Sequence, residues 1–191
     1  MMSFDESSMR EVSDLVFIVE NEKFYVSKLF MASQSKVLKA MFLGQFSEAE
    51  QKEVIVKETK ASDFQLLSEL VYGCDVIDDS TVPKLLRLIH YYDMPLQQAK
   101  VEKFLITMPE KTMKEKFELA KTYKLNELMK FCLSKSNDVE EINALVSSDE
   151  VKDLDEIVAK ELLAKLLLVT KDICGPERPV RIFRPGMKNV Y

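Results

Sequence analysis

The chain of 191 residues contains no tryptophan, one histidine, three cysteines and four glycines, and this scarcity excludes several kinds of site. Loops that cradle phosphate groups are built from closely spaced glycines, and four glycines in all leave no such loop. A metal centre needs clustered cysteine, histidine and carboxylate ligands, whereas the three cysteines and His90 are scattered along the chain. We therefore expect no bound cofactor and no metal site.

The single histidine also bears on catalysis. A cysteine nucleophile would need His90 beside a thiol such as Cys74, and nothing local in the sequence indicates that pairing. The alternative is that His90 is an ordinary packed or surface residue of a helix. Pairs of adjacent carboxylates, for example Asp78 and Asp79, are typical of helix caps and solvent-exposed helix faces. We expect that the protein is not an enzyme.

The sequence also lacks an excess of basic residues and a long apolar run. The formal net charge is -5 and the isoelectric point is near 5.2, so we expect no nucleic-acid partner. The longest apolar run, Leu162 to Val169, has eight residues with Lys165 inside it, which is too short to span a bilayer. We expect no membrane association and no signal peptide. An odd number of scattered cysteines fits a reducing compartment, so we expect a cytoplasmic or nuclear protein.

Strand patterns occur early in the chain and helical patterns later. The β-branched and aromatic run Ser13–Val19 and the alternating run Lys23–Val26 predict a hairpin, and Glu53–Val56 predicts a third short strand. Val76–Ile77 indicates a further brief strand. The rest of the chain to residue 106 follows helical periodicity, which together predicts an α+β fold.

Capping residues mark where several helices begin. Ser27 is the predicted N-cap of the first helix, and Ser62 or Asp63 is the predicted cap of a later helix that ends at Gly73. The spacing Thr112-x-x-Glu115 is that of a capping box and opens a second region with no strand pattern. We expect that region to be all-helical.

These patterns divide the chain into four parts. The first is polar with apolar residues interspersed, and we expect it to become ordered only by docking. The last contains four basic residues against one acidic residue, Glu177, and cannot form a core. The predicted parts are an N-terminal arm (1–12), an α+β domain (13–106), a helical extension (109–174) and a basic tail containing proline and glycine (175–191).

The order of residues in the α+β part resembles a BTB/POZ domain. The matching segments are Ser13-Asp14-Leu15-Val16-Phe17, Phe24-Tyr25-Val26-Ser27-Lys28, Met41-Phe42, Asp63-Phe64, Leu70-Val71-Tyr72-Gly73 and Met94-Pro95. Two positions depart from the family pattern: Ser27 stands where the family has histidine, and His90 where it usually has aspartate. The resemblance implies a BTB/POZ fold, with short strands followed by a helical cluster.

The helices after residue 109 are similar to the BACK or 3-box extension that follows BTB domains in ubiquitin-ligase adaptors. The segments that carry this resemblance are Phe117–Tyr123 and Leu128–Cys132. It implies a protein-interaction adaptor that homodimerises and recruits an unknown substrate protein to a cullin-3 E3 ubiquitin ligase. The alternative is a self-association scaffold in a transcriptional or cytoskeletal complex without a cullin.

A short motif follows the helix that Gly44 ends. We expect that helix to bury Val37, Leu38, Met41 and Phe42 on one side. In the adaptors that this chain resembles, a hydrophobic-x-Glu motif just after the helix contacts cullin-3, and the matching positions here are Phe46, Ser47 and Glu48. A large apolar side chain can fill a pocket while a carboxylate sets the register. The alternative is that Phe46 folds back over the core and Glu48 faces solvent.

The resemblance also implies a homodimer formed by the arm and the first helix. That helix carries more apolar surface than one buried stripe needs, so one of its large side chains should face outward. The predicted interface residues are Phe30, Leu29, Met9 and Phe4. The alternative is a helix that is wholly internal. Asp14 and Lys28 match a charged pair near the dimer groove of the family, although a plain salt bridge is equally possible.

Overall fold

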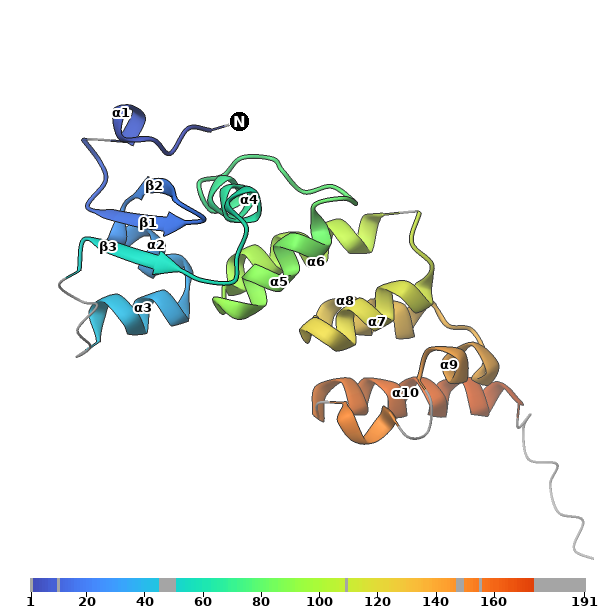
Figure 1. Ribbon diagram of the computed structural model, residues 1–191. Coiled ribbons are helices and arrows are strands. Elements are labelled where there is room, and N and C mark those ends of the chain that lie inside the picture. The colour runs from blue at the N-terminus through green and yellow to red at the C-terminus, as the bar shows by residue number, and fades with distance from the viewer. Residues whose placement is uncertain are drawn as a thin grey trace, which may run out of the picture. The chain divides into compact units, whose positions relative to one another are not determined.

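The computed structural model describes residues 2–9, 11–44, 51–108, 110–146, 150–154 and 156–173. Contacts divide the chain into two compact units that meet between Leu128 and Met129, inside one helix. Each unit is described by itself. Figure 1 shows the strands and most helices of the first unit in blue to yellow, and the helices of the second unit in orange.

Three short strands form the sheet of the first unit. Strand β1 (Leu15–Val19) lies between β2 (Glu22–Val26) and β3 (Glu53–Val56), antiparallel to β2 and parallel to β3 (Figure 1). The hairpin turn has Glu20 and Asn21 at φ of 48° and 71°, as two-residue turns that match the strand twist require. The three strands predicted from apolar alternation are therefore present.

Two helices separate β1–β2 from β3, which the parallel pairing of β1 and β3 requires. Hydroxyl caps begin both: Ser27 Oγ accepts from the amide of Phe30 at 3.5 Å, and Ser35 Oγ accepts from that of Leu38 at 3.0 Å. The predicted Ser27 cap is confirmed. Of the remaining helices of this unit, α1 precedes β1 and the others follow β3. The bounds are α1 Glu6–Met9, α2 Lys28–Gln34, α3 Lys36–Leu43, α4 Ala61–Val71, α5 Val82–Tyr91, α6 Pro95–Thr107 and α7 Met113–Tyr123.

Aromatic rings link the sheet to α4 at the centre of the core. The ring of Phe64 lies edge-on to those of Phe17 and Phe24, with centroids 5.1 Å away in both cases. Phe17 also lies 6.1 Å from Phe42 of α3. All four side chains are buried, so the inward face of the sheet and the two helices share one apolar core.

Two local predictions are wrong. The helix α4 begins at Ala61 with Lys60 as its N-cap, not at Ser62 or Asp63. The Ala61 amide instead donates to the carboxylate of Glu20, in the β1–β2 turn, at 2.8 Å, and buried Asp63 pairs with Arg87 at 2.9 Å. Val76–Ile77 forms no strand, because β-branched residues need a neighbouring strand to pair with.

The predicted capping box at the start of α7 is confirmed. Thr112 Oγ1 accepts from the Glu115 amide at 3.2 Å, and the Glu115 carboxylate accepts from the Thr112 amide at 2.8 Å. The helix α8 (Asn126–Lys135) then begins in the first unit, where the buried carboxylate of Glu102 accepts from the amides of Glu127 and Leu128. Long-range carboxylate caps therefore begin both α4 and α8.

Helices make up the described part of the second unit. They are the end of α8, then α9 (Val139–Leu145), the short 3-10 helix η2 (Glu150–Asp153) and α10 (Glu156–Ile173). Asp138 caps α9 by accepting from the Glu141 amide at 2.8 Å. Across the described residues no helix combines the length and the apolarity that a membrane crossing requires. The predicted basic tail lies outside the described residues.

Candidate protein-interaction surfaces

The start of α3 is fixed to the end of α5. Ser35 Oγ donates to the carbonyl of Tyr92 at 2.5 Å, and the Lys36 amide donates to the carbonyl of Asp93 at 3.1 Å. The Lys36 ammonium also pairs with the Asp93 carboxylate at 3.1 Å. A side-chain bond, a backbone bond and an ion pair therefore hold α3 and the end of α5 as one surface.

A hollow of about 370 Å³ lies on this surface, between α3, β3 and the end of α5. Val37 and Tyr91 line it and are exposed, and half-buried Val54 and Val56 of β3 line it as well. Tyr92 also lines the hollow. Its burial, together with the charge of the nearby Tyr91, raises the pKa of the Tyr92 hydroxyl well above its usual range, so Tyr92 stays neutral. Charged Lys57 and Glu58 line the hollow as well. A hollow of mixed character with an exposed aromatic at its rim can receive a partner's side chain.

Two features of this hollow were not predicted from the sequence. The sequence predicts that Val37, Leu38, Met41 and Phe42 face the core. Leu38 and Phe42 are buried, but Met41 is half-buried and Val37 is exposed, and both of these line the hollow. Tyr91 was not singled out. The signal for it is the pair Tyr91-Tyr92 at the end of an amphipathic helix, in which only the second tyrosine continues the buried stripe.

The predicted cullin-binding residues Phe46, Ser47 and Glu48 lie outside the described residues. On their N-terminal side α3 ends at exposed Leu43, and Gly44 closes the helix by donating its amide to Ala40 at 3.0 Å. On their C-terminal side β3 begins at Glu53. The role of the tripeptide stays a prediction.

The outward face of α2 carries the two most prominent predicted dimer residues. Leu29 is 67% exposed and Phe30 is 37% exposed. The Phe30 ring lies 4.8 Å from that of Tyr72, whose hydroxyl accepts from the Ser27 amide at 3.0 Å. Burial raises the pKa of Tyr72, opposed by the Ser27 hydrogen bond and assisted by the charge of Asp14. A neutral tyrosine thus supports an exposed apolar face.

The other two predicted dimer residues lie inside the chain. Phe4 is 3% exposed and Met9 is 5% exposed. The Phe4 ring packs edge-on against Tyr72 at 5.2 Å, and its carbonyl accepts from the Tyr25 amide at 2.7 Å. The arm is therefore ordered by docking on its own chain. A contact of Phe4 and Met9 with a second chain stays a prediction that would require the arm to move.

Asp14 contacts the backbone of Lys28. The carboxylate accepts from the Lys28 amide at 2.5 Å, so it caps α2 together with Ser27. The Lys28 ammonium lies 5.3 Å from the centre of the Phe42 ring and donates to the carbonyl of Gln51 at 3.5 Å. This contact is local to the start of α2, and the predicted role of the pair near a dimer groove stays a prediction.

The residues that sequence reasoning considered for catalysis do not come together. His90 is exposed on α5, with its ring 6.0 Å from that of Tyr123, while Cys74 is half-buried and Cys132 buried. Within the described ranges, no group of three or more histidine, cysteine or acidic side chains is placed to hold a metal ion. Among the described residues, these catalytic and metal-binding candidates therefore form no common site.

Comparisons with known proteins agree with the observed fold. A model of the BTB/POZ domain family matches residues 4–108. In Caenorhabditis elegans, BTB and MATH domain-containing protein 15 is 45% identical over 139 residues, which cover 73% of this chain and 50% of that protein. Protein 45 of the same series is 39% identical over 172 residues, covering 90% of this chain and 36% of its own length. The chain spans half or less of the length of these two relatives.

Proposed function

The chain belongs to the BTB/POZ domain family, and from this premise we propose that it is an adaptor that homodimerises and brings a substrate to a cullin-3 ubiquitin ligase. Proteins of this family generally act as adaptors or scaffolds that bind other proteins, without catalysing a reaction. The helices that follow the BTB domain support the adaptor role, since the extension they resemble occurs in ubiquitin-ligase adaptors. We propose the cytoplasm or the nucleus as its compartment.

The observation that carries the cullin proposal is the end of α3. This helix stops at Leu43 and the next element begins at Glu53, so Phe46, Ser47 and Glu48 follow the helix within the connection. Exposed Leu43 precedes them. An apolar anchor followed by a carboxylate combines pocket filling with a charged contact that sets the register.

A binding titration tests this proposal. The N-terminal region of cullin-3 is titrated against the wild-type chain and a Phe46→Ala, Glu48→Ala double variant, with Glu50→Ala as a matched control in the same connection. Removing an interface anchor costs about 2 kcal/mol or more, so the double variant should bind at least thirtyfold more weakly. Equal binding by all three chains, or binding by none, would contradict the motif assignment.

We propose the outward face of α2 as the homodimer contact. Leu29 and Phe30 offer adjacent apolar surface, and Tyr72 fixes the Phe30 ring from behind. Leu29→Asp should shift the chain from dimer to monomer in analytical ultracentrifugation, because a carboxylate would be buried without a partner. Ile55→Asp is the matched control, since Ile55 on β3 has the same exposed fraction of 67%. A dimer that survives Leu29→Asp would contradict this assignment.

The remaining part of the proposed adaptor role is substrate binding. The names of the relatives from C. elegans include a MATH domain beside the BTB domain. We propose that the substrate is held by the helical extension, by the basic tail or by a second chain. If the chain dimerises through α2 and binds no cullin-3, the self-association scaffold becomes the better description.

A further inference from the structure

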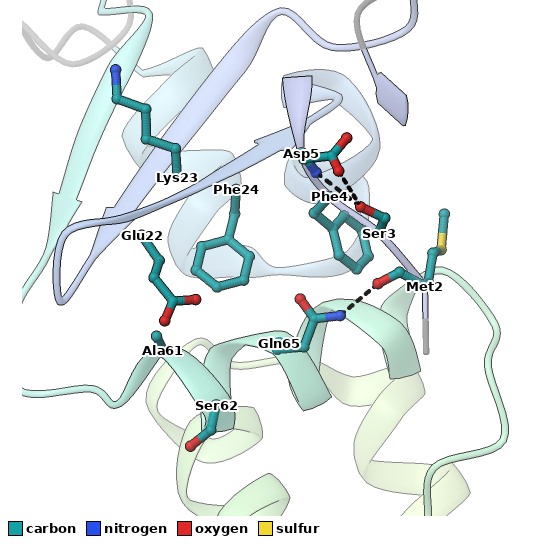
Figure 2. Close-up of a pocket in the computed structure, with 10 residues that line it drawn as sticks. All are labelled: Met2, Ser3, Phe4, Asp5, Glu22, Lys23, Phe24, Ala61, Ser62 and Gln65. Atoms are coloured by element: carbon teal, nitrogen blue, oxygen red, sulfur yellow. Dashed lines mark hydrogen bonds between the residues drawn. The ribbon is translucent and has the colours of Figure 1, made fainter. Parts of the chain in front are cut away.

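One face of α4 carries three side chains that contact the N-terminal arm. Gln65, Glu69 and Tyr72 are spaced i, i+4 and i+7, which places them in one row along the helix and its C-cap. Figure 2 shows the arm segment from Met2 to Asp5 beside the start of this row, with β2 on its other side. The row and the strand flank this piece of the arm.

Both backbone groups of Met2 are held by this row. The Met2 amide donates to the Glu69 carboxylate at 2.7 Å, and Gln65 Nε2 donates to the Met2 carbonyl at 2.6 Å. Gln65 Nε2 also donates to Glu69 at 2.9 Å, which orients the two side chains toward each other. Glu69 is only 3% exposed, and a buried carboxylate is costly unless it accepts such bonds.

The aromatic side chain of Phe4 provides the specific contact two residues later. Its ring packs edge-on against Tyr72, and its carbonyl accepts from the Tyr25 amide on β2. Strand β2 is at the edge of the sheet, where its outward backbone groups can bind an extended segment. Backbone contacts at Met2 and a ring contact at Phe4 together select an extended segment with an aromatic third residue.

The extended segment ends at Asp5. Its carboxylate accepts from the Ser8 amide, the Ser7 hydroxyl and the Ser3 hydroxyl, each at 2.8 Å, and so begins α1. These hydrogen bonds, led by that from Ser3, hold the pKa of Asp5 below its usual range. Beside the segment an open slot of about 490 Å³ remains, lined by residues that include Glu22 and Ser62 (Figure 2). The arm therefore lies on the surface of a groove, with solvent beside it.

We propose that Gln65, Glu69 and Tyr72, with the edge of β2, form a peptide-binding site that recognises an extended segment carrying an aromatic residue two positions after the clamped residue. The chain's own Met2–Phe4 is the ligand that occupies it. The arm binds and leaves as a unit, without unfolding of the sheet. This site is separate from the α3–β3 connection and does not depend on a cullin.

Hydrogen–deuterium exchange of the full chain tests the site. The Tyr25 amide reports on the arm, and the Val16 amide, which donates to Lys52 at 2.8 Å, reports on the pairing of β1 with β3. In a Gln65→Ala, Glu69→Ala variant the Tyr25 amide should exchange on the order of tenfold faster while the Val16 amide is unchanged. Ser62→Ala, in the same slot, should alter neither. Unchanged exchange at Tyr25, or equal acceleration at both amides, would overturn the proposal.

A second variant leaves α4 intact. Phe4→Ala in the full chain should release the arm and accelerate exchange at Tyr25 by a similar factor. A peptide of the sequence Met2–Met9, added at millimolar concentration, should then restore protection of that amide. The same peptide with alanine in place of its phenylalanine should not. Failure of the native peptide to restore protection would show that the arm is only an inseparable part of the fold.

Discussion

Helices α5 and α10, one from each unit, differ in how much apolar surface they bury. In α5 five apolar side chains are buried, and charged or amphipathic residues such as Lys84, Arg87 and His90 face outward. In α10 the described side chains behave differently. Val158, Leu162 and Val169 are buried, whereas large apolar residues between 54% and 62% exposed remain on the surface: Ile157, Leu163, Leu167 and Leu168.

The difference shows that a helix rich in apolar residues can bury most of them, as α5 does, or leave several of them exposed, as α10 does. In α5 the aliphatic residues form one stripe that is buried in the unit's own core, and Tyr91 at the end of the helix lies outside it. In α10 apolar residues occur on several sides, which is typical of helices that are covered on more than one face. Burial therefore accounts for most of the large apolar side chains of α5, but for only some of those of α10.

The largest loss of stability is expected from a substitution at the centre of the first unit. Phe64→Ala removes the ring that packs against both Phe17 and Phe24, and should lower the free energy of unfolding by about 3–5 kcal/mol. Chemical denaturation with a probe in each unit measures it. A loss below about 1 kcal/mol would show that this core is less tightly packed than its geometry indicates.

Two neighbouring residues of α10 give an intermediate test. Leu162 is buried and Leu163 is exposed, although both are leucines in the same helix. Leu162→Ala should cost about 2–4 kcal/mol of stability, whereas Leu163→Ala should change it by less than about 0.5 kcal/mol. Thermal unfolding of both variants compares them. Equal losses would mean that Leu163 is covered in solution, and would remove the contrast with α5.

The smallest expected effect on stability comes from the capping box at the start of α7. Hydrogen bonds from the amide and then the hydroxyl of Thr112 lower the pKa of the Glu115 carboxyl from its ordinary 4.5. A lowered pKa in the folded state stabilises the cap above about pH 4.5, and this contribution is lost as the pH falls through the lowered value. Carboxyl NMR titration should show the shift, and Thr112→Ala should return the pKa toward its ordinary value.

Local patterns predicted much of the fold. The strands, the Ser27 cap and the capping box at Thr112 were all recognisable, because each depends on residues within a few positions of one another. The start of α4 was not, because the carboxylate that accepts from its first amide belongs to Glu20, a residue 41 positions earlier in the β1–β2 turn. Val76–Ile77 has strand-forming residues, but strand formation also depends on a neighbour that the local sequence does not specify.

Some features of the candidate surfaces can likewise be predicted from the local sequence, whereas others depend on tertiary packing. The exposed face of α2 follows from an excess of apolar residues in one short helix. The exposure of Val37 depends on how α3 packs beside β3, and the hollow there includes Tyr91 from a helix far along the chain. The tripeptide Phe46-Ser47-Glu48 was identified by its place in a family pattern, and its role in binding cullin-3 stays a prediction.

The sequence by itself determined the α+β class, the strands, several helix caps and the membership of the BTB/POZ family, since periodicity and short motifs are properties of neighbouring residues. Only the tertiary structure decided which apolar residues of similar appearance become surface and which become core. Val37 of α3 faces solvent, whereas Phe4 of the polar arm is buried. The physical reason is that the contacts of the arm join distant residues, as the Met2 amide and Glu69 do across 67 positions.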